Sequence, residues 1–354
     1  MSAGAAVITG FSANTSLGDE RQAGAAARAG LARPAELEAQ AWDGEDGAVA
    51  VVGHPVPTAR GFQGEARLLA LALEPLTRLW REAALPAGHE VGLLLGTPDL
   101  KRRAERAGAA LPRARPLPDR LAALAGLPAT GKWRQAFPIG HAGFAAAANA
   151  ALQLLARGEV EACVVGGVDT LCDRLALAAL GAEQRLKTAD NPVGLQPGEA
   201  AAFLLLEKPE AARRRGAKVL ARIGGVGVAA EPRSEEDGPL GQGLLAALRE
   251  LVAAAGAPPA GQAFFVLDRN GEASRAADWG HCQQRLTAGF PGLLPAAQWD
   301  PATSFGDTGA ASGALGAGLA IRGFDRRYAP APSAIVLSAS DGGPRAALRL
   351  DQVR

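Results

Sequence analysis

The sequence predicts an α/β protein whose strands are mainly parallel and buried. Short apolar runs alternate along the chain with Ala-rich segments of helical length, an order that is typical of α/β folds. Aromatic residues make up only 5% of the chain, whereas Gly and Ala are abundant, so helices and strands can approach each other closely. The predicted strands span residues 6–8, 91–95, 162–165, 202–206, 264–267 and 334–338.

Length, charge and cysteine usage exclude several classes of protein. The chain has 354 residues, enough for one large domain or two smaller ones, and a net charge of +1 with both signs interspersed. It contains no basic stripe for nucleic acid or a membrane surface, no basic leader, and no apolar run of about 18 residues that could span a bilayer. Cys163, Cys172 and Cys282 stand at no metal-binding or redox spacing. We therefore expect a cytoplasmic protein without a metal or other cofactor.

The segment FPIGHAGFAAAANAALQLLARGEVEACVVGGVD, residues 137–169, is built as strand, tight turn, helix and strand. Its Ala-rich part predicts a helix over 145–156, which ends at Gly158, a residue typical of the position after a helix. The apolar run 162–165 follows as a buried strand. Such a unit presents one residue at the head of its helix, and here that residue is His141.

A second segment has the same construction. TSFGDTGAASGALGAGLAIRGF begins at Thr303 and predicts a helix of small residues over 309–321, closed by Arg322 and Gly323 and followed by the strand 334–338. In a chain rich in Ala and Gly this similarity can be a coincidence. The alternative is an internal duplication, in which two similar halves pack their thin helices back to back.

Four segments carry a resemblance to a known family. They are AAVITGFSANTSLG (5–18), EVGLLLGT (90–97), VVGGVD (164–169) and GLQPGEAAAFLLLEKPEAARRRGAKVLARIGGVG (194–227). They resemble the β-ketoacyl-ACP synthases, the condensing enzymes of the thiolase superfamily. The resemblance implies a thiolase-like five-layered αβαβα fold, with halves at 1–215 and 216–354 that each contain a five-stranded mixed sheet. It also implies a dimer, which we expect to form through an edge strand at 162–166.

The resemblance also identifies the positions at which the family carries its catalytic residues. The family's cysteine heads the first helix seventeen residues before an Arg-Gly pair, and the same count back from Gly158 reaches His141. The family's motif NAHGTGT is similar to DRNGEASRAAD, residues 268–278, which has Asn270 in place of the histidine. At the third position, where elongating enzymes have GH and initiating ones have GNT, this chain reads GDT with Asp307. The gating loop FGFGG is replaced by SDGG, residues 340–343.

If this alignment of the chain with the family's motifs is right, the replacements leave two hypotheses for the site. If the alignment is shifted, His141, Asn270 and Asp307 lie apart. In the first, Asp307 and Asn270 bind the imidazole of His141, which plugs the former acyl site as a locked cation, because a buried polar group needs partners. In the second, His141 is a base oriented by Asp307, and a water or a substrate hydroxyl is the nucleophile.

Decarboxylative condensation needs a thiolate and histidine-like donors, which these positions lack. The sequence therefore predicts a non-catalytic binding partner, either a chain-length-factor-like subunit or an adaptor, as a homodimer or in a heterodimer with an active synthase. An acyl carrier protein is a further candidate partner. The alternative is an acyl-handling transferase or hydrolase that uses His141 with Asp307 and Asn270.

Overall fold

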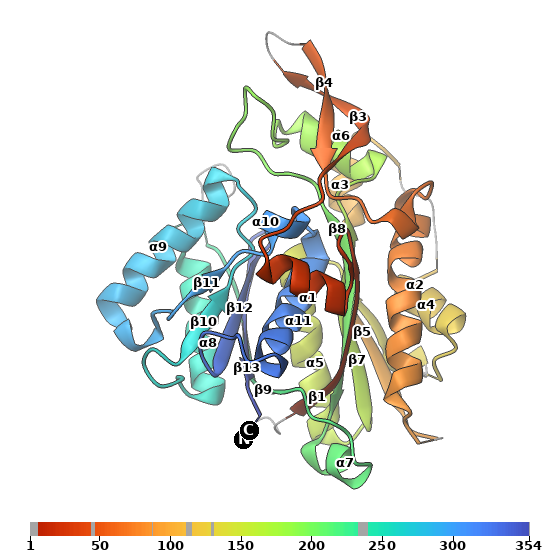
Figure 1. Cartoon of the computed structure of the whole chain (residues 1–354), viewed down its shortest axis with the longest axis vertical. Helices are drawn as coiled ribbons and strands as arrows, with labels where there is room; N and C mark the ends of the chain where they lie inside the picture. Colours follow the sequence, from red (N-terminus) through yellow and green to blue (C-terminus); the bar gives the residue numbers. More distant parts are fainter. Residues whose placement is uncertain are drawn as a thin grey trace.

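The strands form one long sheet and a separate hairpin (Figure 1). The computed structural model describes residues 6–43, 47–86, 88–110, 115–128, 131–232 and 240–353. The strands are β1 (Ala6–Thr15), β2 (Gly18–Asp19), β3 (Ala35–Asp43), β4 (Gly47–Gly53), β5 (Val91–Gly96), β6 (Arg134–Phe137), β7 (Ala162–Thr170), β8 (Glu199–Glu207), β9 (Ala221–Ala230), β10 (Ala263–Val266), β11 (Gln298–Trp299), β12 (Ser333–Ala339) and β13 (Pro344–Asp351).

The helices surround and separate the strands of the long sheet. Several begin at a side-chain cap, as α1 does at Asp19, whose carboxylate accepts the N–H groups of Arg21 and Gln22. The helices are α1 (Glu20–Arg28), α2 (Gly64–Ala83), α3 (Leu100–Arg106), α4 (Leu117–Ala125), α5 (Gly143–Arg157), α6 (Arg174–Ala182), α7 (Pro209–Arg214), α8 (Gln242–Ala255), α9 (Ala273–Gly289), α10 (Ala302–Phe305) and α11 (Ser312–Asp325).

The long sheet has the strand order β11-β10-β12-β13-β9-β1-β8-β7-β5-β6, with β2 paired to β1. Its strands are parallel at β5–β6, β5–β7, β10–β11 and β10–β12, and antiparallel at its other pairs. The prediction of mainly parallel strands was therefore wrong, and the sheet is mixed. An apolar run indicates that both faces of a strand are buried, and helices on both sides bury antiparallel strands equally well.

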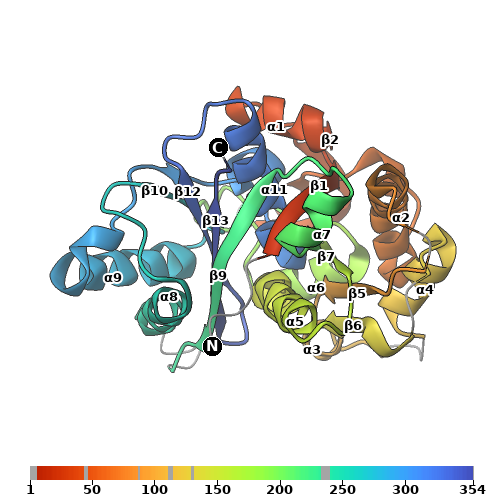
Figure 2. The ribbon, with the colours of Figure 1, turned by 90° about the horizontal axis from the view of Figure 1, so that it is seen from below.

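Five layers result from the way this sheet bends (Figure 2). The strands up to β8 form one group and β9–β13 the other, and β1 joins them by pairing with β9 over only three residues. Helices α5 and α11 lie between the two groups, while α2 and α4 cover one outer face and α8 and α9 the other (Figure 2). This arrangement is the predicted thiolase-like α/β fold. The division into halves at residue 215 stays a prediction.

Both central helices begin in the same way but end differently. A 3-10 turn, Gly140–Ala142 before α5 and Gly309–Ala311 before α11, starts each one. As predicted, α5 ends at Gly158, which has φ 71°. The predicted end of α11 at Gly323 was wrong, because the helix continues to Asp325. A Cβ on Gly323 would lie 2.9 Å from the Trp299 ring, so this glycine serves close packing and does not end the helix.

The edge of the sheet is not where the sequence placed it. β7 pairs with β5 on one side and with β8 on the other, so the expected edge strand at 162–166 is an inner strand. The strand at that end of the sheet is β6, which pairs with β5. The sequence predicted a strand at the start of the segment 137–169, whereas β6 ends at Phe137, and its sequence RQAF contains no apolar run. Within the described ranges, no helix has the length and hydrophobicity needed to span a membrane.

Candidate functional site

His141 lies at the head of α5, on the buried 3-10 turn that follows Gly140. Gly140 has φ 68°, a left-handed backbone that glycine adopts without strain, and it turns the chain sharply out of the preceding segment. The head of α5 also packs tightly on β5, since a Cβ on Gly96 would lie 2.5 Å from the backbone nitrogen of Phe144. The backbone N–H of Ala142 donates to Ser340 Oγ at 2.9 Å. These contacts hold His141 between the two strand groups.

The three residues identified from the sequence meet at this point. His141 Nε2 lies 2.8 Å from Asp307 Oδ1, and Asn270 Nδ2 donates to Asp307 Oδ2 at 2.6 Å. The backbone N–H of Gly309, at the head of the second helix, also donates to Asp307 Oδ1 at 2.8 Å. All three side chains are buried, with exposed fractions of 8% or less. The sequence led us to expect His141 within hydrogen-bond reach of Asp307 or Asn270, and the contact with Asp307 is present. That these residues stand at the family's catalytic positions stays a prediction.

The second ring nitrogen of His141 faces a cation that the sequence analysis did not identify. Nη2 of Arg275, on α9, lies 3.4 Å from His141 Nδ1. The same Nη2 donates to Asp341 at 2.8 Å, and the guanidinium also lies 3.4 Å from Asp268. Both nitrogens of the imidazole are therefore directed at protein groups.

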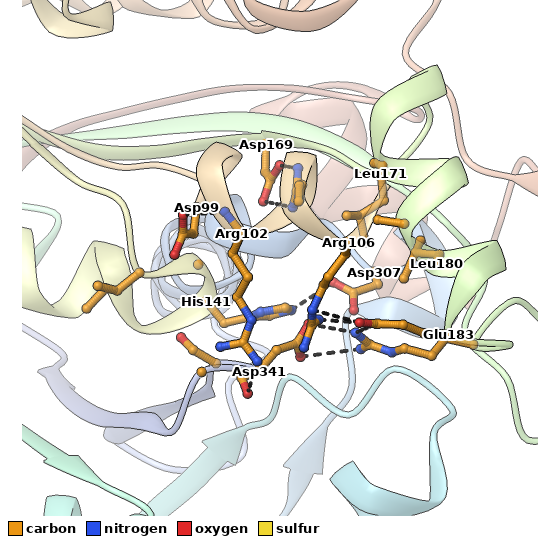
Figure 3. Close-up of a pocket in the computed structure, with 18 of the residues that line it drawn as sticks. Asp99, Arg102, Arg106, His141, Asp169, Leu171, Leu180, Glu183, Asp307 and Asp341 are labelled. Atoms are coloured by element: carbon orange, nitrogen blue, oxygen red, sulfur yellow. Dashed lines mark hydrogen bonds and ion pairs between the residues drawn. The ribbon is translucent and has the colours of Figure 1, made fainter. Parts of the chain in front are cut away.

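Several ion pairs lie around His141 and Asp307 (Figure 3). Arg185, in the loop after α6, binds both carboxylate oxygens of Glu272 at 2.7 and 2.8 Å and lies 2.8 Å from Asp341. Glu272 also accepts a hydrogen bond from Asn270 at 2.8 Å. The segment SDGG, where the family has its gating loop, is thus tied by Asp341 to two arginines. In the sequence these residues lie in separate loops and form no motif.

A further buried ion pair connects the first strand group to the second helix head. Arg103 binds both oxygens of Asp169 at 2.7 and 2.8 Å. Asp169, the last residue of VVGGVD, accepts the backbone N–H of Ala310 at 2.8 Å. Gly309 must be glycine here, because its φ is 54° and a Cβ would lie 2.1 Å from the Asp169 carboxylate. The head of the second helix is thereby held against the end of β7.

The neighbouring charges shift the pKa values of His141 and Asp307. Burial by itself lowers the pKa of His141, but the charge of Asp307 and its hydrogen bond outweigh burial and the repulsion of Arg275, so this pKa is raised. Burial likewise raises the pKa of Asp307, but the charges of His141 and Arg275 and the hydrogen bonds of His141 and Asn270 hold it far below its ordinary value. The charge of Asp307 therefore favours the protonated form of His141, which is the direction expected from the sequence.

This pair predicts how stability depends on pH. The pKa of His141 is higher in the folded protein than the value of about 6.5 in an unfolded chain, so its stabilisation is complete below that pH and is lost as pH rises through the folded pKa. Unfolding by urea from about pH 6 upward, for the wild type and His141→Gln, measures the effect. We expect the stability difference between the two proteins to shrink as pH rises. A difference that stays constant over this range would show that His141 does not titrate with folding.

A cavity of about 210 Å³ reaches the network (Figure 3). Apolar side chains such as Ile139, Leu171 and Leu180 form one wall, and charged residues, including His141 and Asp341, form the other. A second cavity of about 20 Å³, the size of about one water, touches His141 and Asp307 from another side. Among the described residues no cysteine lines either cavity, and no group of His, Cys, Asp and Glu side chains could hold a metal ion.

The three cysteines are buried elsewhere, and none is a substitute nucleophile at the head of α5. Cys163 lies in β7, Cys282 lies in α9, and Cys172 follows β7. Burial raises the pKa of each thiol. Thiolate formation is therefore disfavoured at all three positions.

Comparisons with known proteins agree with the fold. No family model matches the chain. The 3-oxoacyl-[acyl-carrier-protein] synthase 2 proteins of Mycobacterium tuberculosis and Mycobacterium bovis are 29% identical to it in an alignment of 183 residues that covers 44% of this chain and 44% of theirs. The chain thus matches less than half the length of these curated relatives.

Solved structures match nearly the whole chain, each over 99% of its residues. The ishigamide ketosynthase/chain length factor has a TM-score of 0.77 at 20% identity, with all of that chain covered. The AntDE:AntF complex, a type II PKS acyl-carrier protein with its ketosynthase bound to the hexaketide, has 0.80 at 14%, also fully covered. The ketosynthase from module 6 of the bacillaene synthase from Bacillus subtilis 168 has 0.79 at 14%, with 72% of that chain covered. The chain therefore has the thiolase-like fold of these ketosynthase structures, and part of its sequence is similar to the 3-oxoacyl-[acyl-carrier-protein] synthase 2 proteins.

Proposed function

We propose that the chain is a non-catalytic binding protein of this fold, a chain-length-factor-like subunit or adaptor that associates with an active synthase. The observation that carries the proposal is the state of His141. By the resemblance it stands where the family has its cysteine; its Nε2 is held by Asp307 at 2.8 Å and its Nδ1 faces Arg275 at 3.4 Å.

The chemical requirements of condensation also support a non-catalytic role. The reaction needs a thiolate that carries the acyl group as a thioester, and hydrogen-bond donors for the enolate and the oxyanion. An imidazole does not form a stable thioester, and no thiol lines the described cavities. Asp307, whose pKa is held very low, is an ionised acceptor at the position where the reaction requires a donor. Its negative charge would repel the developing enolate.

One observation favours the alternative, an acyl-handling hydrolase or transferase. His141 and Asp307 have the spacing of a base and its orienting carboxylate, and the cavity of about 210 Å³ reaches both residues. In such a site, however, the second ring nitrogen faces a nucleophilic hydroxyl or water. Here it faces Arg275, and the raised pKa of His141 favours the protonated ring, a form that cannot accept a proton. The binding role is therefore the better supported of the two.

The surface that we propose for association is the side of β6 that faces away from β5. Of the described strands only β5 pairs with β6, so the edge of the sheet along Gln135–Phe137 can pair with a strand of another chain. The likeness to the ishigamide ketosynthase/chain length factor supports a heterodimer with an active synthase. A second copy of this chain would use the same edge.

An activity assay tests the proposal. Light scattering first measures the mass of the purified protein, which gives its oligomeric state. With malonyl and acyl groups on acyl carrier protein, we expect no ketoacyl product from the wild type, while an active synthase serves as the positive control. His141→Cys should also be silent, because Asn270 and Asp307 still lack the required donors. Ketoacyl product from the wild type would overturn the proposal. Release of free acyl chains that disappears in His141→Gln would favour the hydrolase instead.

A further inference from the structure

A surface cleft of about 510 Å³ lies beside the short helix α10. Its walls come from α1, β11, the start of α10 and the far end of α11. Pro301, which precedes α10, lines both this cleft and the small cavity that touches His141. The cleft is within the size range of small-molecule sites, about 300–1,000 Å³. Neither the family resemblance nor the proposed function assigns it a role.

Two aromatic rings form one wall of the cleft. Trp299 and Tyr328 have ring centroids 5.9 Å apart and an interplanar angle of 31°, and both are half-buried. The buried ring of Phe264 supports Trp299 from behind, with centroids 4.5 Å apart. The backbone N–H of Tyr328 donates to Gly323 O at 3.0 Å, which fixes the chain that carries the ring. The wall is therefore present before any ligand arrives.

The charge at the cleft is positive. The guanidinium of Arg28 lies 4.5 Å from the centre of the Tyr328 ring, and no carboxylate lies within ion-pair distance of it in the part of the chain that the structure describes. The carboxylate of Asp300 is already neutralised by Arg269, which binds its two oxygens at 2.8 and 2.5 Å.

The positively charged side chains near the cleft also outnumber the carboxylates that pair with them. Asp325 is shared by Lys218 at 2.7 Å, Arg322 at 3.4 Å and Arg326 at 3.6 Å. The stem of Arg322 lies beside Gly24, a residue that lines the cleft, since a Cβ on Gly24 would lie 3.3 Å from the Arg322 Cγ. The charges of Arg322 and Arg28 both act on the Tyr328 hydroxyl. An anion is therefore the favoured ligand.

We propose that this cleft binds a small planar aromatic carboxylate, with its ring against Trp299 and Tyr328 and its carboxylate paired with Arg28. Aromatic rings stack in offset or tilted geometry with centroids roughly 4.5–7 Å apart, which matches a wall of two slightly tilted rings. A guanidinium presents two parallel N–H groups to a carboxylate, a fit that an ammonium group lacks. The ligand would extend the stack of Arg28 on Tyr328. This site is separate from the His141 network and does not depend on its function.

Calorimetric titration with 2-naphthoate tests the site on the full chain. We expect binding that is weakened about tenfold or more in Arg28→Gln, because a charged hydrogen-bonding partner is lost. Arg249→Gln is the matched control: its guanidinium lies 5.0 Å from the Phe290 ring in a different groove, and we expect no change. Circular dichroism confirms that both variants fold.

Two further probes separate the contributions of the ring and of the charge. Cyclohexanecarboxylate has the charge without the planar ring, and 2-naphthamide has the ring without the charge, so both should bind more weakly than 2-naphthoate. Absence of 2-naphthoate binding at millimolar concentration would overturn the proposal. Equal weakening by Arg28→Gln and Arg249→Gln would overturn it too, because it would show non-specific attraction to surface arginines.

Discussion

Replacing Asp307 with Ala is expected to lower the free energy of unfolding by about 3–5 kcal/mol, the range for removing one partner of a buried ion pair. The carboxylate accepts hydrogen bonds from His141, Asn270 and the backbone of Gly309. Without it, the amide of Asn270 and the backbone N–H of Gly309 lose their acceptor in a buried site, and burial and the charge of Arg275 lower the pKa of His141. Urea unfolding of the two proteins at neutral pH measures the change.

The control for this substitution is Glu105→Ala. Glu105 pairs with Lys101 at 3.8 Å on the surface of α3, and the two side chains are 65% and 85% exposed. An exposed pair of this kind contributes at most about 0.5 kcal/mol. A second test is coupling, since the cost of His141→Ala should be much smaller when Asp307 is already absent. Similar costs for Asp307→Ala and Glu105→Ala would contradict a structural role for the network.

Replacing Gly167 with Ala is expected to cost about 3 kcal/mol or more, at or beyond the upper end for overpacking a core. Gly167 lies in β7 against the head of the second helix, where a Cβ would be 2.2 Å from Ala310 O and 3.0 Å from Ala311 Cα. Both are backbone atoms in a layer enclosed by two strand groups, so displacing either one costs considerable free energy. Thermal or urea unfolding of the purified variant measures the loss.

Gly181→Ala is the matched substitution for this prediction. Gly181 lies in α6 on the surface, and a Cβ there meets nothing within 4 Å. Ala is favoured over Gly in a helix by about 0.5–1 kcal/mol, so this variant should gain stability. If Gly167→Ala were as stable as the wild type, the close contact between β7 and the second helix head would be disproved.

The sequence by itself determined the local units and their order. The Ala-rich helix ending at Gly158, the matching helix after Asp307, and the positions of His141, Asn270 and Asp307 follow from residues that are neighbours in the chain. The α/β class follows in the same way, because the alternation of apolar runs and helical segments is a local pattern. The direction of the pKa shift of His141 could also be predicted, because burial lowers this pKa and one partner, Asp307, makes the largest contribution that raises it.

Only the tertiary structure decided which strands pair, where the sheet ends and what encloses the site. β7 is an inner strand because β5 and β8, from distant parts of the chain, pair with it, and no apolar pattern encodes strand direction. The cations at the site come from equally far away: Arg275 is 134 residues from His141, and Arg185 is 156 residues from Asp341. Isolated arginines and carboxylates are normally solvated surface residues, so their sequence context carries no sign of burial. They become partners because the two strand groups fold around the same pair of helices and enclose these charges between them.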